Sequence, residues 1–265
     1  MGKYKITRIP GGIGFLKRGM SNSGEGLSPL IWHDCPLAAM AVDPTIGVTA
    51  GDDFVSVQAT GFPYLITGAN GTFAAVPAVT HGQAVLTATG ADNDECYVTT
   101  NNNVAGLIKA DATHDWWFEA RVKVSQITLA QGVFVGLAEE TGVGADFMTD
   151  NTMAMKVLDS IGFQIIAATD IAAVWQSAMQ LNGGARAAIN ATLATASTSF
   201  VKLGMTSKAG KVRFFVNGVP DSTTVSSGDT NFPLDQVMQI TFATKCGQGT
   251  ANTLTLDWWR AAQLR

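Results

Sequence analysis

The pattern of apolar and polar residues after residue 50 is typical of short β-strands. Residues 118–124 (FEARVKV) alternate apolar with polar side chains, and residues 133–138 (VFVGLA) form a short apolar run. Four further segments combine β-branched, aromatic and polar residues in similar ways: 200–206, 212–216, 238–244 and 253–259. Such residues favour a pleated surface with at least one buried face. The pattern therefore predicts a strand at each of these segments.

Turn residues separate the predicted strands. Residues 208–211 and the Asn217-Gly218 pair are turn signals on either side of residues 212–216, and together they predict a β-meander. A glycine-rich turn at 247–249 separates the last two strands. Residues 185–196 are rich in alanine but also contain Asn and Thr, so we interpret them as a loop or a short helix. Because no sustained helical period is present, the sequence predicts an all-β protein, an antiparallel β-sandwich.

The first 50 residues are organised differently, and we interpret them as an extended N-terminal arm. Proline and glycine interrupt this segment repeatedly, yet its apolar residues are too numerous for an ordinary linker. We place the boundary at Gly51, which gives an arm of residues 1–50 and a sandwich domain of residues 51–265. Two alternatives stay open for the arm. It packs on its own body, or it lies along a neighbouring subunit.

Charge is distributed unevenly along the chain. The formal net charge is −4, whereas residues 1–18 carry five cations and no acid. The remainder is correspondingly more acidic than the whole chain. An acidic body disfavours coating of nucleic acid, which needs clustered positive charge to displace counterions. For the basic arm alone, RNA, DNA and an acidic protein surface remain alternatives.

Composition narrows the class of protein further. Charged residues make up only 14% of the chain, against about 25% in average domains. A neutral, threonine-rich surface favours large permanent interfaces, with an ordinary threonine-rich β-protein as the alternative. The apolar residues at the N-terminus are interrupted at Pro10, and residues 161–175 are too short to span a bilayer, so a soluble protein is expected.

The spacing of cysteine and histidine predicts no metal or cofactor. Cys35, Cys96 and Cys246 are far apart in the sequence and form no Cys-x-x-Cys pair, so we expect reduced thiols. His33 lies two residues from Cys35, but no second pair completes a four-ligand site.

The order of the predicted strands resembles a known fold. The runs WWFEARVKV, VFVGLAEE, IGFQ, FVKLGMTSKAGKVRFFVNGVPDS, QITFATK and TLTLDWWRAAQ resemble the concanavalin A-like jelly roll of laminin-G modules, legume lectins and many glucanases. The resemblance covers about residues 52–265. The arm sequence SNSGEGLSPLIWHDCPLAAMAVDPTIG, followed by GDDF, is similar to virion proteins of tailed bacteriophages encoded with the head genes.

This second resemblance implies a function. It implies a capsid decoration (cement) protein that binds the outer surface of the virion capsid and stabilises it, made in the host cytoplasm. Its expected partners are the major capsid protein and itself, as a homotrimer. The predicted capsid or subunit contacts are Lys3, Lys5, Arg8, Phe15, Lys17, Arg18, Leu30, Ile31 and Trp32. The alternative is a carbohydrate-binding head or tail appendage protein, and a degenerate glycoside hydrolase is the third hypothesis.

The sequence was searched for catalytic residues of this and other folds. Retaining glucanases of the jelly-roll fold resemble one another in a Glu-x-Asp-x-(x)-Glu strand, which no segment contains. Glu119, Glu139 and Glu140 are instead interpreted as surface charges, and no nucleophile elbow or phosphate-binding loop is present. We therefore predict no enzymatic activity. In Trp116-Trp117 and Trp258-Trp259, one ring of each pair is expected in the core and the other on the outer face.

Overall fold

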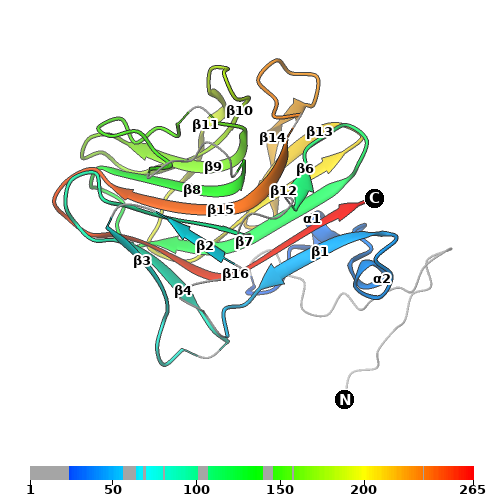
Figure 1. The fold of residues 1–265 in the computed structure, drawn as a ribbon, viewed down its shortest axis with the longest axis horizontal. Coiled ribbons are helices and arrows are strands. Elements are labelled where there is room, and N and C mark those ends of the chain that lie inside the picture. The colour runs from blue at the N-terminus through cyan, green and yellow to red at the C-terminus, as the bar shows by residue number, and fades with distance from the viewer. Residues whose placement is uncertain are drawn as a thin grey trace.

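The chain folds as two antiparallel β-sheets that face each other (Figure 1). The computed structural model describes residues 24–55, 64–67, 70–79, 81–100, 107–139, 146–156, 158–234 and 236–265. Within these residues, helix is confined to α1 (Pro29–Trp32) and α2 (Leu37–Val42) in the arm. The predicted all-β antiparallel sandwich is confirmed.

Sheet I has the strand order β14-β13-β12-β7-β16-β4-β3, and β1 also pairs with β16. Its strands are β1 (Gly47–Asp52), β3 (Gly71–Ala75), β4 (Ala84–Ala88), β7 (Trp116–Val124), β12 (Val201–Lys208), β13 (Lys211–Val216), β14 (Val219–Ser226) and β16 (Asn252–Leu264). The first and last strands of the described chain therefore lie side by side.

Sheet II has the order β11-β10-β9-β8-β15-β5-β2, and β6 also pairs with β15. Its strands are β2 (Tyr64–Thr67), β5 (Glu95–Thr100), β6 (Ile108–Lys109), β8 (Gln131–Ala138), β9 (Ser160–Ala167), β10 (Val174–Gln180), β11 (Ala187–Thr195) and β15 (Val237–Cys246). In the two sheets together, six strands match the segments predicted from the sequence: β7, β8, β12, β13, β15 and β16. Each begins earlier or ends later than its predicted segment.

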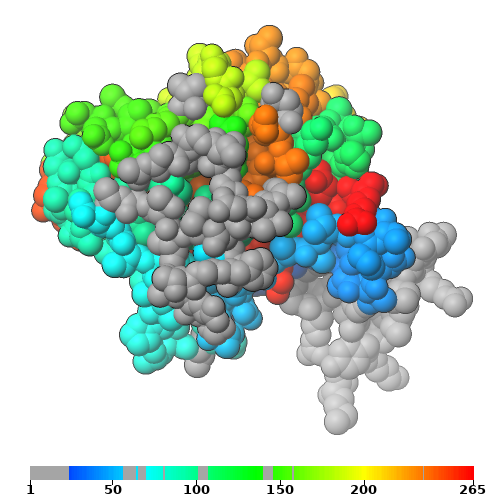
Figure 2. Space-filling model, viewed as in Figure 1, coloured from blue at the N-terminus to red at the C-terminus, as the bar shows by residue number. Residues whose placement is uncertain are grey.

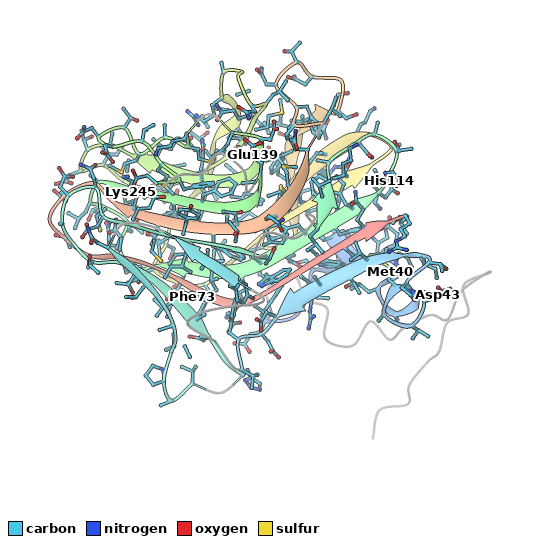
Figure 3. All side chains as sticks on the ribbon, in the orientation of Figure 1. Met40, Asp43, Phe73, His114, Glu139 and Lys245 are labelled. Atoms are coloured by element: carbon cyan, nitrogen blue, oxygen red, sulfur yellow. The ribbon has the colours of Figure 1, made fainter. Side chains whose placement is uncertain are left out.

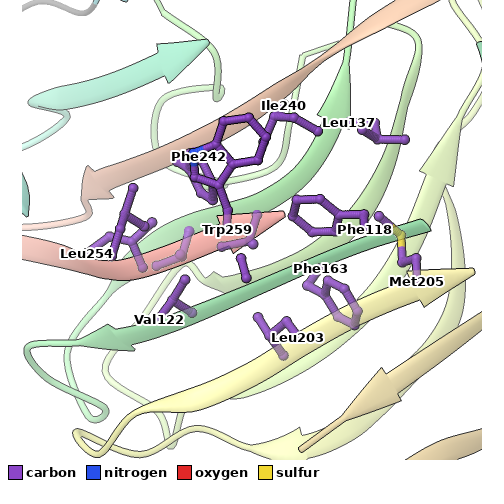
Figure 4. Packing of buried hydrophobic residues seen from close by; sticks show 14 of the residues in the cluster. Phe118, Val122, Leu137, Phe163, Leu203, Met205, Ile240, Phe242, Leu254 and Trp259 are labelled. Atoms are coloured by element: carbon purple, nitrogen blue, oxygen red, sulfur yellow. The ribbon is translucent and has the colours of Figure 1, made fainter. Parts of the chain in front are cut away.

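The core lies between the sheets, where inward-facing side chains alternate with outward-facing ones. Phe118 and Val122 of sheet I are fully buried with Phe163 and Phe242 of sheet II (Figure 4). Burial of this apolar surface is the main favourable contribution to folding. Trp116 and Trp259 belong to this core, whereas their neighbours Trp117 and Trp258 face outward, as predicted.

One predicted element is wrong. Residues 185–196, interpreted as a loop or short helix, contain strand β11 at the edge of sheet II. Its side chains are half-buried or exposed throughout, and Ile189, Ala191 and Leu193 alternate with Asn190 and Thr192 over five residues only, a short signal within an alanine-rich segment. Pairing with β10 determines its conformation, and this pairing overrides the helical propensity of alanine.

The described part of the arm packs on the outer face of sheet I. Ile31, Trp32 and Met40 form a second buried cluster with Trp117 and Phe215. In Figure 2, the blue N-terminal helices lie beside the red C-terminal strand. The boundary placed at Gly51 falls inside β1, which is hydrogen-bonded to β16 along its length. Residues 24–52 therefore pack on the body of their own chain, which is the first of the two alternatives for the arm.

Glu119 anchors the arm and corrects a prediction. Predicted to be a surface charge, it is fully buried on the outer face of β7. Its Oε2 atom accepts hydrogen bonds from the Ser28 backbone N–H (3.0 Å) and from Trp32 Nε1–H (2.7 Å). Burial raises the pKa of Glu119, although these donors and the charge of Lys202 oppose that shift. The sequence predicted that Glu119 faces outward on its strand. It did not predict that the arm covers this outer face of sheet I.

We expect Gly218→Val to destabilise the sandwich by at least about 1 kcal/mol, because Gly218 has φ 73° in the turn between β13 and β14. A β-branched residue is strained in this region. Thermal unfolding should show a melting temperature about 2–4 °C lower. Gly228→Val is the matched control, since a side chain there meets only Ser226 Oγ. An equal loss in both variants would contradict the role assigned to the turn.

We expect Glu119→Gln to change how stability depends on pH. A raised pKa means that the folded state holds the proton more tightly than the unfolded chain does. The resulting stability is fully present below the ordinary glutamate pKa of 4.5 and is lost as pH rises through the folded pKa. The melting temperature of the wild type should therefore fall relative to the variant as pH rises. A relative rise would contradict this expectation.

Candidate functional site

A row of small side chains crosses the middle of the outer face of sheet II. Ala178, Gly162, Gly136, Thr241 and Thr99 are consecutive partners on β10, β9, β8, β15 and β5. Their neighbours along these strands point inward to the core, so the five residues share the outward face. We call this feature the small-residue row.

Amide side chains lie beside the row on the same face. Gln164 is two residues from Gly162 on β9, and its Nε2 donates a 3.1 Å hydrogen bond to Gln176 Oε1. Within the part of the chain that the structure describes, three buried oxygens here have no hydrogen-bond partner: Thr99 Oγ1, Gln164 Oε1 and Gln180 Oε1. A buried oxygen without a partner costs free energy, which a ligand or water that donates a hydrogen bond would recover.

Aromatic rings border the row on its other side. A Cβ atom at Gly136 or Gly162 would lie 3.1 Å from Phe134 Cζ, so the Phe134 ring lies against both glycines. Phe147 packs 5.1 Å from Phe134 and 5.7 Å from Tyr97, measured between ring centroids. The three rings are almost fully buried and pack with one another over the row as a further core cluster.

A buried ion pair holds residues 146–156 against this sheet. Glu95 on β5 and Lys245 on β15 are strand partners with no exposed side-chain surface, and Lys245 Nζ lies 3.1 Å from Glu95 Oε2 (Figure 3). Glu95 Oε1 accepts a 2.6 Å hydrogen bond from the Phe147 backbone N–H. Burial alone lowers the pKa of Lys245, but the carboxylates of Asp150 and Glu95 outweigh it and raise this pKa. The pair therefore fixes the position of Phe147.

Two carboxyl groups meet where β8 ends and β9 begins. Glu139 and Asp159 are both buried, and the Glu139 backbone N–H donates a 2.8 Å hydrogen bond to the Asp159 carbonyl. Asn182 joins their side chains, because its backbone N–H donates to Asp159 Oδ1 (2.8 Å) and its Nδ2 donates to Glu139 Oε1 (3.0 Å). Burial, followed by the nearby charge of Asp159, raises the pKa of Glu139. Glu139 is thus not the predicted surface charge. Asn182 therefore holds the two carboxyl groups in place.

The predicted contact residues are divided between described and undescribed segments. Lys3, Lys5, Arg8, Phe15, Lys17 and Arg18 lie outside the described residues. Ile31 and Trp32 are buried against sheet I, whereas the side chain of Leu30 is 50% exposed. Contact of these residues with a capsid or a subunit stays a prediction. Glu140, together with residues 101–106 and 141–145, also lies outside the described residues.

Sequence reasoning missed the small-residue row. Its members are single small residues on five strands, and only the register of those strands brings them together. Gly136 and Gly162, each inside an apolar run, were the available signal, since glycine inside a strand often marks close approach of another group.

Two further findings on the described residues concern metal ions and membrane-spanning helices. No group of three or more His, Cys, Asp or Glu side chains among them is placed to hold a metal ion. No helix in the same residues is long and apolar enough to cross a membrane.

Comparison with known proteins identifies the fold. No protein-family model matches the chain, and no curated protein matches it. Among solved structures, peanut lectin with a bound peptide is similar at TM-score 0.56 and 12% identity, over 83% of this chain and 98% of the lectin. A mixed-linkage glucan GH16 protein of Bacteroides ovatus, in complex with a product, is similar at TM-score 0.54 and 10% identity, over 79% and 98%. The Bacillus licheniformis β-glucanase gives 0.52 and 12%, over 81% and 98%.

These matches confirm the jelly-roll fold and correct one prediction. The prediction of a protein without enzymatic activity is wrong as an inference from this fold, because glycoside hydrolases are among the chains that share it. At 10–14% identity, what is shared is the fold. The structures named above are a lectin and two glucan-related proteins, and none of them is a capsid protein.

We expect Lys245→Met to destabilise the protein by about 3–5 kcal/mol, because it leaves the Glu95 carboxylate buried without its partner. Urea unfolding measures the loss. The matched control is Lys156→Met, which breaks the partly exposed pair with Asp146 and should cost about 1 kcal/mol at most. The double variant Glu95→Gln/Lys245→Met should recover much of the loss. Similar losses in the two single Lys→Met variants would contradict the anchoring role of the buried pair.

Proposed function

We propose that this protein binds a neutral carbohydrate on the outer face of sheet II. The observation that carries the proposal is the combination of the small-residue row with adjacent amide and hydroxyl oxygens that have no partner among the described residues. Sugars present hydroxyl groups that donate such hydrogen bonds. The residues that carry these oxygens are at most 3% exposed, so a sugar reaches them only where the side chains packed over this face give way.

Charge supports a neutral ligand. Glu95 and Lys245 are the charged residues at outward positions of β5, β8, β9, β10 and β15, and they pair with each other. An acidic glycan would find no unpaired cation on these strands. A neutral glycan needs none, because amides and hydroxyls supply both donors and acceptors.

The structural neighbours support the same class of ligand. They include a lectin, a carbohydrate recognition domain, and a glucanase in complex with a mixed-linkage glucan product. A soluble mixed-linkage gluco-oligosaccharide is therefore the first probe to use, within a panel of neutral oligosaccharides.

The resemblance of the arm supports a finer proposal about where this binding takes place. A carbohydrate-binding jelly roll on a phage particle would be a head or tail appendage protein. Attachment to the major capsid protein, a homotrimer and a place on the outer surface of the virion are further proposals that rest on this resemblance alone.

We expect titration calorimetry to detect binding of at least one neutral oligosaccharide, with affinity reduced about tenfold by Gln164→Ala. A hydrogen bond to the buried Gln164 oxygen is worth about 1–1.5 kcal/mol, which corresponds to that factor. The control is Gln83→Ala, which removes a side-chain amide of the same type next to Asp257 on sheet I. It should change the affinity less than about twofold.

Counting of reducing ends during the titration separates binding from hydrolysis. The proposal fails if no neutral oligosaccharide in the panel binds, or if Gln164→Ala and Gln83→Ala have the same effect.

A further inference from the structure

The outer face of sheet I has a different chemistry from that of sheet II. Its four central strands place seven cations and two acids at outward positions. The cations are Arg121, Lys123, Lys202, Lys208, Lys211, Arg213 and Arg260, and the acids are Glu119 and Asp257. Twelve of the 17 Lys and Arg residues lie beyond residue 23, and seven of these twelve share this one face. Three of these cations already have partners: Arg121 pairs with Asp257 and Glu25, Lys208 pairs with Asp34, and Lys202 donates to the Gly26 carbonyl. The other four still make this face more positive than a chain of net charge −4 would suggest, which indicates a surface for an anion.

Part of this face combines cations with aromatic rings, and we call it the cation–aromatic cluster: Arg121, Lys123, Phe200 and Trp258. The Arg121 guanidinium lies 4.3 Å from the centroid of the Phe200 ring, and Lys123 Nζ lies 4.7 Å from it. Trp258 is the strand partner of Arg121 on β16 and is half-buried. Cation–π contacts of this kind hold the cations in place next to an accessible ring.

Two carboxylates and a backbone carbonyl orient the cluster. Asp257 Oδ2 lies 2.5 Å from Arg121 Nη1, and Glu25 Oε1 lies 3.5 Å from Arg121 Nη2. The Trp258 Nε1–H donates a 2.7 Å hydrogen bond to the Glu25 carbonyl. The cluster therefore offers fixed cations, a fixed indole ring and carboxylate acceptors close together.

We propose that the cation–aromatic cluster binds a carboxylated polysaccharide. Its carboxylates would pair with Lys123, because Arg121 already pairs with Asp257 and Glu25. Its hydroxyl groups would donate to those two carboxylates, and a sugar ring would stack on Trp258. A DNA strand fits less well, because the sugars within the strand have no free hydroxyl groups to donate to Asp257 and Glu25. This site lies on the opposite sheet from the neutral face and does not rest on the function proposed for that face.

The chain upstream adds charge of the same sign. The five cations of residues 1–18 precede Gly24, and Glu25 and Gly26 contact Trp258 and Lys202 through their carbonyl oxygens. Five residues, 19–23, separate Arg18 from the first described residue, Gly24.

The test is binding of the full chain to polygalacturonate at low and high salt, with neutral dextran and a poly(dT) oligonucleotide as comparison ligands. We expect polygalacturonate to bind at low salt, to weaken as salt rises, and to bind more tightly than either comparison ligand. Lys123→Ala and Trp258→Ala should each weaken binding about fivefold or more. The matched control Lys211→Ala removes an exposed cation of the same face away from the aromatic rings, and should weaken binding less than about twofold.

Four results would overturn the proposal: no binding of polygalacturonate at low salt, equal binding of dextran, tighter binding of poly(dT), or equal losses in Lys123→Ala and Lys211→Ala. Thermal unfolding confirms that each variant is folded. Gln164→Ala on sheet II should leave polygalacturonate binding unchanged, so failure of this proposal is distinguishable from failure of the neutral-carbohydrate proposal.

Discussion

The burial of one carboxylate on the outer face of each sheet is the constraint on which the rest of the structure depends. A buried carboxylate needs hydrogen-bond donors, and here backbone N–H groups of a segment lying across the sheet supply them. Glu119 takes its donors from Ser28 and Trp32, and Glu95 takes them from Phe147 and Met148 as well as from Lys245. Each glutamate thereby fixes where one segment lies. Strands such as β8 are buried on both faces as a result, which an ordinary two-layer sandwich does not require.

This constraint gives the two outer faces their separate chemistry. On sheet I, the arm held by Glu119 lies across the centre of the face and leaves the cation–aromatic cluster at its side. On sheet II, Glu95 and Lys245 are the charged residues at outward positions of the central strands, and they pair with each other. The residues around Gly136 and Gly162 are therefore amides, hydroxyls and small side chains. The two ligands that we propose, one charged and one neutral, would therefore bind on opposite sides of the sandwich.

The sequence predicts the sandwich well because core strands alternate in a way that the chain itself displays. Phe118, Val122 and Leu203 face inward at every second position, and the turn residues between strands are local signals. The burial of Glu119 has no such signal, because its donors come from residues 91 and 87 positions away. The small-residue row depends on the register of several strands, which no single strand reveals. Strand β11 was missed because its alternation of Ile189 and Leu193 with Asn190 and Thr192 is short and lies in an alanine-rich segment.

We propose that the outer face of sheet II binds carbohydrate. Mapping of backbone amide chemical shifts during titration with a neutral gluco-oligosaccharide tests this proposal most directly, because every strand reports separately. We expect shifts concentrated on β8, β9 and β15 around Gly136, Gly162 and Thr241, with sheet I unchanged. Shifts confined to sheet I, or no shifts at saturating oligosaccharide, would contradict it.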